Sequence, residues 1–342
     1  MKRNSMKKIM TVIVAAAMVC SLTACGQTGA AGSGAAQTVE TTDAAQSASQ
    51  DAAATDASGS DNAAQSTDSA SADTTTEASQ TPVTGSVTAS GSSALLPLAQ
   101  VAAETFMEKN PDCIITTNGG GSGTGLKEVA AGTVDIGDSD VFAEEKLDAD
   151  TAKGLVDHEV CTITMAPVVN KSLGVTNLTT DQLVAIFTGK TTNWKEVGGP
   201  DKDIVLVSRP DSSGTRALFK KWALGGAEEA SNKALETDDS GTLLQTVEDN
   251  DAAIGYVALS YLVNNDKVQA VGIDGVEPTL ENTNNGTYKV WGYEHMYTKG
   301  DGTDAAKAFI EYISGDEYAD SLESMGYGVT SKLSTEAAAA HK

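Results

Sequence analysis

The sequence predicts an α/β fold with mainly parallel sheets, and two observations lead to it. From about residue 83 to residue 333, short apolar runs of strand length alternate with segments of helix length. Turns rich in glycine and serine stand where a strand would pass into a helix. Because parallel strands need crossover connections, which are usually helical, this alternation favours parallel sheets covered by helices. About 250 residues exceed what one hydrophobic core usually holds, so two domains are expected.

The pattern predicts each element in turn. In chain order the expected strands are 85–90, 113–117, 134–137, 204–208, 253–259, 268–272 and 288–297. The expected helices are 94–108, 124–131, 180–187, 216–224, 304–312 and 317–325. Asn110-Pro111 ends the first helix, because proline cannot continue one. Thr179 or Thr180 caps the third helix, and Gly189 closes it.

Residues 1–25 have the pattern of a secretion signal. A positively charged start precedes an apolar run at 9–19, which is shorter than a membrane span. The run ends in Leu-Thr-Ala-Cys, which resembles a bacterial lipobox. Signals of that kind are cut before the cysteine, so we expect Cys25 to carry lipid such as palmitate and to anchor the chain to the cell membrane. The alternative is an ordinary signal peptide in which Cys25 is incidental.

Residues 26–82 are predicted to form a disordered tether. They contain no aromatic residue, leucine or isoleucine, and Val39 is their largest aliphatic residue. Such a segment cannot bury enough apolar surface to offset the entropy of ordering it. A flexible chain of this length reaches roughly 40 Å. At the other end, residues 334–342 are expected to be a loose tail.

Cysteine content and charge exclude some classes of site. Cys113 and Cys161 are expected to be buried thiols, with a disulfide between them as the alternative. Metal binding is not expected, since no Cys-x-x-Cys occurs and the histidines are scattered. The net charge of −24 argues against nucleic acid as a partner. It does not exclude a small anion, because nearby dipoles outweigh distant charges that salt screens.

Two glycine- and serine-rich turns could help to hold such an anion. Residues 90–94 read Ser-Gly-Ser-Ser-Ala, and residues 119–125 read Gly-Gly-Gly-Ser-Gly-Thr-Gly. Each leads from a strand into a helix, whose first N–H groups lack intrahelical partners. Each glycine costs roughly 0.5–1 kcal/mol to order relative to alanine, which suggests that something approaches the backbone closely. The alternatives are an ordinary helix cap and a flexible surface loop.

A third turn, Arg-Pro-Asp-Ser-Ser-Gly-Thr from Arg209 onward, offers the most chemistry. The guanidinium of Arg209 matches two oxygens of a tetrahedral oxyanion. Asp211 could hold Arg209 in place from behind. Ser213 and Thr215 supply hydroxyls, and Gly214 lets its N–H approach a ligand. The alternative is a surface Arg–Asp pair beside a helix cap.

A fourth segment, Asp-Ile-Gly-Asp-Ser-Asp at 135–140, brings acids close to this anion site. Hydrogenphosphate carries a proton at neutral pH that an ionised carboxylate can accept, whereas sulfate has none to give. A site built to pair a substrate hydroxyl can reject an analogue without it by roughly 10⁴–10⁵. We assign this acceptor role to Asp140, and a turn or cap role to Asp135.

These segments resemble the substrate-binding lipoproteins of the high-affinity phosphate ABC transporter (the Pst system). The likeness covers about residues 83 to 333 and is carried by 91–95, 119–125, 135–140, 209–215 and Trp-Gly-Tyr-Glu-His-Met-Tyr-Thr at 291–298. It implies an α/β, two-lobed "Venus flytrap" of the periplasmic-binding-protein type. Lobe one would comprise 83–164 plus 293–333, and lobe two 165–292. The chain would cross between the lobes twice, near Val160 and near Tyr293.

The resemblance also implies where phosphate would bind, in a cleft between the lobes. The matching positions are Ser93, the N–H of Ala94, Ser122, Asp140, Arg209, Ser213, Gly214 and Thr215. The chain would be a monomer without a cofactor, outside the cytoplasm, and would close around the ion. The closed form would dock on the membrane permease and ATPase subunits of the transporter.

Three other functions remain to be weighed against this one. A serine hydrolase using Ser213 or Ser93 is disfavoured, because no nucleophile elbow occurs and His158 and His295 are interpreted as structural. The chain is therefore expected not to be an enzyme. The same fold could instead bind sulfate, molybdate or another oxyanion. An adhesin or a phosphate sensor that feeds no transporter is the third alternative.

Overall fold

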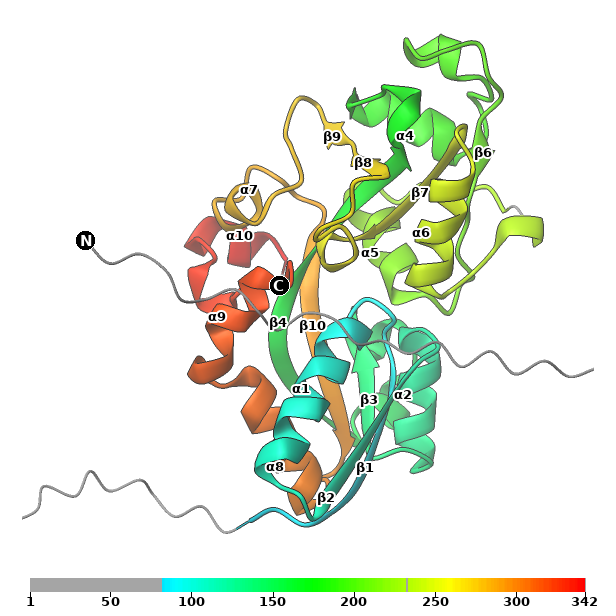
Figure 1. Cartoon of the computed structure of the whole chain (residues 1–342). Coiled ribbons are helices and arrows are strands. Elements are labelled where there is room, and N and C mark those ends of the chain that lie inside the picture. The colour runs from blue at the N-terminus through cyan, green and yellow to red at the C-terminus, as the bar shows by residue number, and fades with distance from the viewer. Residues whose placement is uncertain (1–81, 232, 342) are drawn as a thin grey trace, which may run out of the picture. The chain divides into compact units, whose positions relative to one another are not determined.

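The computed structural model describes residues 82–231 and 233–341, all of which belong to one compact unit of the chain (Figure 1). The predicted signal peptide at 1–25, with Cys25, lies outside the described residues, and so does the predicted tether except for residue 82. Among the described residues, no helix is both long and apolar enough to cross a bilayer.

Strands and helices alternate through the first part of the chain, as predicted. The strands are β1 (Gly85–Gly91), β2 (Cys113–Gly119), β3 (Ile136–Ser139), β4 (Leu155–Asn170), β5 (Asn177–Leu178), β6 (Val205–Leu206), β7 (Ala253–Ala258), β8 (Val268–Ala270), β9 (Gly272–Ile273) and β10 (Trp291–Lys299). The α-helices are α1 (Leu96–Lys109), α2 (Ser122–Ala131), α3 (Ala149–Ala152), α4 (Thr180–Phe187), α5 (Gly214–Trp222), α6 (Ser240–Asp249), α7 (Leu280–Asn284), α8 (Asp304–Ser314), α9 (Asp316–Ser324) and α10 (Thr335–Ala340).

An eight-stranded sheet has the order β2-β1-β3-β10-β4-β7-β6, with β8 beside β4. β1 is parallel to β2 and β3, and β6 is parallel to β7. β10 is antiparallel to β3 and β4, and β4 is antiparallel to β7 and β8. The sheet is therefore mixed, and the prediction of mainly parallel sheets was wrong. One cause is β10, which comes from late in the chain and inserts between β3 and β4, and the other is β4, which is antiparallel to β7 and β8.

β4 is a long strand whose two halves have different partners. Residues 155–164 pair with β10, and residues 165–170 pair with β7 and β8. Its residues from 160 to 169 are all buried. A strand covered on both faces is a continuous apolar run rather than an alternating one, which is the pattern seen in the sequence. β4 and β10 together connect the β1–β3 end of the sheet to the β6–β7 end (Figure 1).

Helices cover both faces of the β1–β3 end. In Figure 1, α1 and α8 lie together on one face and α2 lies on the other. Phe106 of α1 meets Phe309 of α8 edge to face, with 5.7 Å between ring centroids. Leu126 and Val129 of α2 belong to a separate buried cluster that includes Tyr297 of β10. The helices therefore cover the two faces of this end of the sheet, and the turns that follow β1, β2 and β3 lie at its edge.

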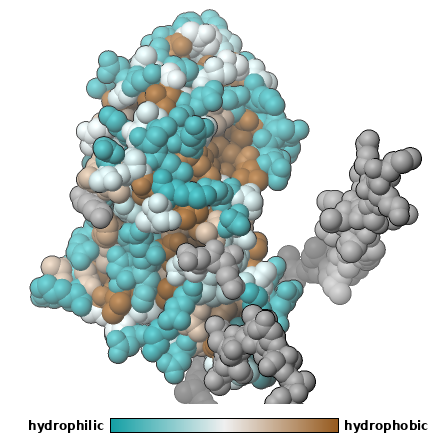
Figure 2. All heavy atoms as spheres, turned by 90° about the vertical axis from the view of Figure 1, so that its left-hand side faces the viewer, coloured by the Kyte–Doolittle hydropathy of each residue, from teal (hydrophilic) through white to brown (hydrophobic). Residues whose placement is uncertain are grey.

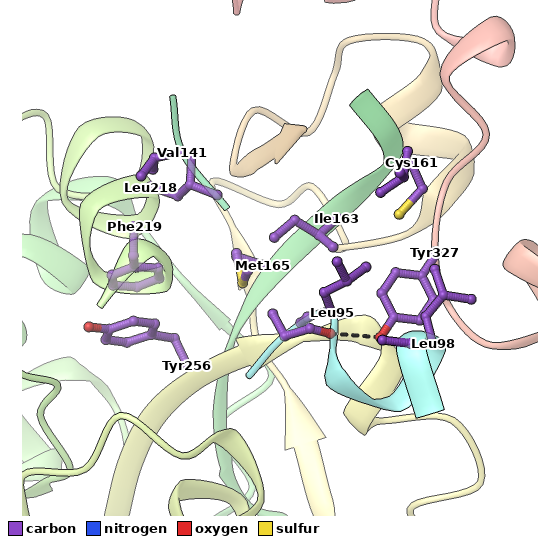
Figure 3. Close-up of a cluster of buried hydrophobic side chains, with 14 of the residues drawn as sticks. Leu95, Leu98, Val141, Cys161, Ile163, Met165, Leu218, Phe219, Tyr256 and Tyr327 are labelled. Atoms are coloured by element: carbon purple, nitrogen blue, oxygen red, sulfur yellow. Dashed lines mark hydrogen bonds between the residues drawn. The ribbon is translucent and has the colours of Figure 1, made fainter. Parts of the chain in front are cut away.

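A continuous apolar core follows β4 from one half to the other. Figure 3 shows Cys161, Ile163 and Met165 of this strand among buried side chains that include Leu98 of α1 and Tyr256 of β7. All five belong to one buried cluster. The same core therefore contains residues from the half of β4 that pairs with β10 and from the half that pairs with β7 and β8.

Cys113 and Cys161 are both buried and not bonded to each other, which confirms the prediction of two thiols and excludes the disulfide. Burial raises the pKa of both thiols, and nearby carboxylates add to the effect at Cys161. Since the thiolate is the reactive form, neither cysteine has the electropositive, accessible surroundings of a redox or catalytic thiol.

The predicted loose tail at 334–342 is corrected by the structure as far as residue 341. Ser334 caps α10 by accepting the N–H of Ala337 at 3.1 Å. The ring of His341 then stacks between Trp222 and Trp291, with 3.8 Å between its centroid and each of theirs. The run of alanines favours a helix. Its sequence gave no sign of the aromatic stack, which depends on residues far away in the chain.

The surface mixes polar and apolar side chains. Figure 2 shows one face, on which hydrophilic residues surround smaller areas of apolar ones. The exposed large apolar side chains of the described residues are Val101, Ile114, Phe142, Val156 and Val263. Single exposed apolar side chains of this kind are normal on soluble proteins.

Candidate functional site

Turns that follow parallel strands meet at one edge of the sheet. β1, β2 and β3 run in the same direction, so their carboxyl ends lie side by side. The N–H of Gly121 donates to the carbonyl of Gly91 at 2.8 Å, and the N–H of Ser92 donates to that of Asp138 at 2.9 Å. These backbone bonds fix the three turns against one another, which brings their side chains into one place.

The first turn gives its two serines different tasks. Ser92 Oγ accepts the N–H groups of Ala94 and Leu95 at 3.1 and 3.0 Å, so it holds the turn that leads into α1. Ser93 instead donates across the site to the carbonyl of Asp238 at 2.8 Å. The N–H of Ala94, which was predicted to contact the ligand, is held by Ser92 in this structure. The hydroxyl of Ser93 therefore faces Asp238 and Ser240.

The second turn uses its glycines for close approach, as predicted. Gly121 has a φ of 85°, and a Cβ there would lie 1.8 Å from Oδ2 of Asp238. The N–H of Gly123 donates to the carbonyl of Ser212 at 3.0 Å. α2 begins at Ser122, earlier than the pattern predicted, because the turn at Gly121 is immediately followed by helical backbone. The start of α2 therefore contacts the residues just before α5.

The third turn places the start of α5 against the start of α2. Ser213 caps α5 by accepting the N–H of Arg216 at 3.3 Å. A Cβ at Gly214 would lie 2.0 Å from Oγ of Ser122, so only glycine fits there without movement. Two helix N-termini, both carrying partial positive charge, thus point toward one small volume.

Asp140 lies where these turns meet. Its Oδ2 accepts the hydroxyl of Thr215 at 2.7 Å, and its Oδ1 accepts the hydroxyl of Ser92. Its N–H donates to Oγ of Ser122 at 3.0 Å. Asp140 is 2% exposed. The carboxylate of Asp140 therefore contacts Thr215, another predicted site residue, which lies 75 residues away in the chain.

Arg209 is fully buried beside these groups. Its Nη1 donates to the carbonyl of Asp238 at 3.1 Å. Its Nη2 donates to Oγ of Ser240 at 3.0 Å and to the carbonyl of Tyr256 at 3.1 Å. Its Nε has no hydrogen-bond partner among the described residues. A buried guanidinium with a spare donor is suited to an anion that water does not reach.

Asp211 does not hold Arg209, which corrects the prediction. Its carboxylate pairs instead with Nη1 of Arg216 at 3.1 Å, and the side chain is 95% exposed. The reason is geometric, because the proline between Arg209 and Asp211 starts a turn that directs the aspartate outward to solvent. An exposed pair of this kind stabilises little.

Two further carboxyl groups are buried behind Asp140. Burial raises the pKa of Asp138 well above its usual range, and the charge of Asp140 adds to this. Burial likewise raises the pKa of Glu294, with contributions from Asp140 and Asp138. Neither oxygen of Asp138 has a hydrogen-bond partner within the described chain. Burial thus favours the neutral form of both groups, and Asp140 accepts the hydroxyls of Thr215 and Ser92 in this cluster.

Sequence reasoning missed four residues that line the site. Ser240, at the start of α6, shares a hydrogen bond of 2.9 Å with Ser93. Tyr261 donates to the carbonyl of Ser93 at 2.6 Å, and Lys146 donates to that of Ser213 at 3.0 Å. Asp238 is the fourth. A signal was present, because the Ser-Gly-Thr of the third turn recurs from Ser240 onward, again at the start of a helix.

Comparison with known proteins identifies the family. Residues 75–317 match the PBP superfamily domain. Over 238 residues the chain is 52% identical to the phosphate-binding protein PstS of Bacillus subtilis (strain 168), which covers 70% of this chain and 78% of that protein. This chain belongs to the PstS family within the PBP superfamily.

Solved structures agree with this assignment. A putative phosphate ABC transporter substrate-binding protein with bound phosphate from Clostridium perfringens is 37% identical, with a TM-score of 0.65 over 71% of this chain and 98% of that one. An ABC-type phosphate transport receptor from Vibrio cholerae is 29% identical, with a TM-score of 0.56 over 71% of this chain and 99% of that one. The predicted periplasmic-binding-protein fold class is confirmed.

PstS-family proteins bind substrates for transport and are not enzymes, in agreement with the expectation for this chain. The two histidines interpreted as structural fit the same view. His295 Nδ1 lies 2.9 Å from Asp157, and His158 Nε2 lies 3.2 Å from the hydroxyl of Thr298. Each histidine is thus engaged away from the serines of the turns.

Proposed function

We propose that this chain binds inorganic phosphate outside the cytoplasm and delivers it to an ABC permease for uptake. The ion would lie between lobe one, residues 83–164 plus 293–333, and lobe two, residues 165–292. The contacts would come from Ser93, Ala94, Ser122, Asp140, Arg209, Ser213, Gly214 and Thr215. The named relatives from B. subtilis and C. perfringens, a phosphate-binding protein and a structure with bound phosphate, support this choice of ligand.

One observation carries the proposal furthest: the starts of α2 and α5 meet at Asp140 next to a buried arginine. Oδ2 of Asp140 accepts the hydroxyl of Thr215, and the N–H of Asp140 donates to Oγ of Ser122. Arg209 is fully buried and donates to the carbonyl of Asp238 and to Oγ of Ser240, the two groups that Ser93 also contacts. Helix dipoles, hydroxyls and a guanidinium can together replace the hydration shell of a multiply charged ion.

Asp140 gives the site its preference for an oxyanion that carries a proton. Monohydrogen phosphate and arsenate have a hydroxyl that can donate to a carboxylate, and sulfate does not. Sulfate would meet the negative charge of Asp140 without a hydrogen bond, which combines repulsion with an unmet acceptor. Sulfate and molybdate are therefore the weaker candidates, because nothing in the site supplies a donor in place of the carboxylate.

Titration calorimetry of the ligand-stripped protein tests the assignment. Phosphate and arsenate should bind, and sulfate at the same concentration should give no saturable heat. Equal binding of phosphate and sulfate would contradict the role of Asp140. Binding of neither ion, by a protein that is folded by circular dichroism, would contradict the proposed function as a whole.

We further propose that lipid on Cys25 anchors a monomeric chain to the cell membrane, where it meets the permease and ATPase subunits. The support is the lipobox-like Leu-Thr-Ala-Cys ending at Cys25. Labelling cells with a radioactive fatty acid should mark the protein, and Cys25→Ser should abolish the label and release the chain. Gel filtration of the released chain should give the size of one copy. Phosphate uptake that is unchanged when the protein is deleted would favour a sensor or an adhesin.

A further inference from the structure

Glu229 is an acid that the phosphate contacts leave unexplained. It follows α5, and its side chain is only 1% exposed. Its neighbour Glu228 is 71% exposed and pairs with Lys220 at the surface. A carboxyl group is rarely buried unless charged or hydrogen-bonding partners surround it. The contrast between these two neighbours indicates that Glu229 is held inward by specific contacts.

Those contacts are with an arginine and a tyrosine. The hydroxyl of Tyr256 donates to Oε2 of Glu229 at 2.8 Å. The same oxygen lies 3.6 Å from Nε of Arg216. Tyr256 itself is fixed, because its ring stacks on that of Phe219 with 4.1 Å between centroids and 2° between planes (Figure 3). Glu229 therefore touches α5 and β7 at once.

Both partners of Glu229 also hold Arg209. Nη1 of Arg216 donates to the carbonyl of Arg209 at 2.5 Å. The carbonyl of Tyr256 accepts Nη2 of Arg209 at 3.1 Å, and the guanidinium carbon lies 5.4 Å from the centre of the tyrosine ring. Glu229 is thus linked to the arginine through two separate residues. Asp211, the acid that the sequence placed in this position, points to solvent.

We propose that Glu229 is the positioning residue for Arg209, and that the charge on Glu229 sets how strongly Arg209 attracts the anion. This inference rests on the proposed function, since it concerns the same phosphate site. Ionised Glu229 offsets part of the positive charge of Arg209 and Arg216. Protonated Glu229 leaves that charge available to an anion while the contact with Tyr256 still holds the geometry.

The balance between the two forms changes near neutral pH. Burial raises the pKa of Glu229 to about 7, against the opposing effects of Tyr256, Arg216 and Arg209. These three residues, from β7, α5 and the turn before α5, are the groups that face the carboxyl. A bound anion favours the protonated form, so the proton and phosphate stabilise each other's binding. The affinity for phosphate should therefore fall as the pH rises through this range.

Two substitutions separate the charge of Glu229 from its position. Glu229→Gln keeps the shape and an oxygen for Tyr256 but cannot ionise. We expect it to bind phosphate as the unmodified protein does at pH 6, and about fivefold more tightly at pH 8. Glu229→Ala removes the oxygen as well, so Arg209 loses support and affinity should fall about tenfold at pH 6. The fall should be smaller at pH 8, where loss of the negative charge partly compensates. Glu228→Gln is the matched control and should follow the unmodified protein.

The measurement is calorimetry of phosphate binding to the full chain between pH 5.5 and 8.5. Phosphate itself titrates in this range, and the comparison between variants removes its contribution because it is common to all of them. A constant ratio of affinities between Glu229→Gln and the unmodified protein across the range would overturn the proposal. That outcome differs from failure of the proposed function, in which the unmodified protein would not bind phosphate.

A second measurement needs no variant, in case Glu229→Gln does not fold. Carbon-13 NMR of glutamate side chains in the unmodified chain should show one carboxyl that titrates near pH 7. Saturating phosphate should move that titration upward by at least half a pH unit. A titration that phosphate does not move would contradict coupling between Glu229 and the anion.

Discussion

Asp140 shows how one buried side chain can hold several turns of a site together. It accepts hydroxyls from Ser92 on the β1 turn and from Thr215 on α5, so it helps to hold these turns together. Burial raises the pKa of the neighbouring acids Asp138 and Glu294 well above their usual range, which favours their neutral forms.

Replacing Asp140 with asparagine should weaken selectivity more than it weakens folding. The amide keeps an oxygen for Thr215 but removes the negative charge that repels sulfate. We expect the preference for phosphate over sulfate to fall at least tenfold, since one buried charge pair is typically worth more than 1.4 kcal/mol. Competition calorimetry with both anions measures the ratio. An unchanged ratio would mean that Asp140 only holds the turns together.

At the scale of elements, the sequence predicted the strand–turn–helix units but not all of their ends. β1, β2, α1 and α4 lie within a few residues of the predicted ranges, and the capping box of α4 begins at Thr179, one of the two predicted caps. α6 was missed, since its polar first turn has little helical pattern despite the cap at Asp239. The contact between Ser93 and Ser240 spans 147 residues, and no local pattern reveals such a pairing.

The meeting of α2 and α5 depends on a single glycine, which makes it testable. Gly214→Ala would place a Cβ 2.0 Å from Oγ of Ser122, so one helix must shift away from the other. Overpacking of this kind costs about 1–3 kcal/mol. We expect phosphate affinity to drop at least tenfold. We also expect the free energy of unfolding to fall by about 1–3 kcal/mol, the cost of overpacking.

A matched control for Gly214→Ala is Gly154→Ala. A Cβ at Gly154 would have its nearest neighbour, the carbonyl of Thr151, at 3.4 Å, and no steric shift is needed there. This variant should bind phosphate normally and unfold at nearly the same urea concentration as the unmodified protein. Equal loss of affinity in both variants would count against the close approach of the two helices as the cause.

For the molecule as a whole, the last residues tie distant parts of the fold together. His341 stacks between Trp222, which ends α5, and Trp291, which begins β10. Burial lowers the pKa of His341 to about 4, although a hydrogen bond to the carbonyl of Lys289 acts in the opposite direction. The folded protein therefore resists a proton that an unfolded chain would accept below about pH 6.5.

Because folding lowers the pKa of His341, the free energy of unfolding should decrease as the pH falls. Above about pH 6.5 the stack contributes fully, and its contribution falls as the pH drops toward 4, because protonation then favours the unfolded chain. The loss is at most about 3 kcal/mol. His341→Phe keeps an aromatic ring but does not titrate. In urea unfolding between pH 7 and pH 4, the stability of the unmodified protein should fall relative to that of His341→Phe as the pH drops, and parallel curves would contradict the account.

The same stack makes the protein its own optical reporter. Trp194 is fully buried elsewhere in the core, while Trp222 and Trp291 lie against an imidazole that quenches indole emission most when protonated. α5 begins at the anion site and ends at Trp222, so a small rotation of this helix on ligand binding would alter the emission spectrum. Phosphate could then be followed in real time by intrinsic fluorescence, without attaching any dye.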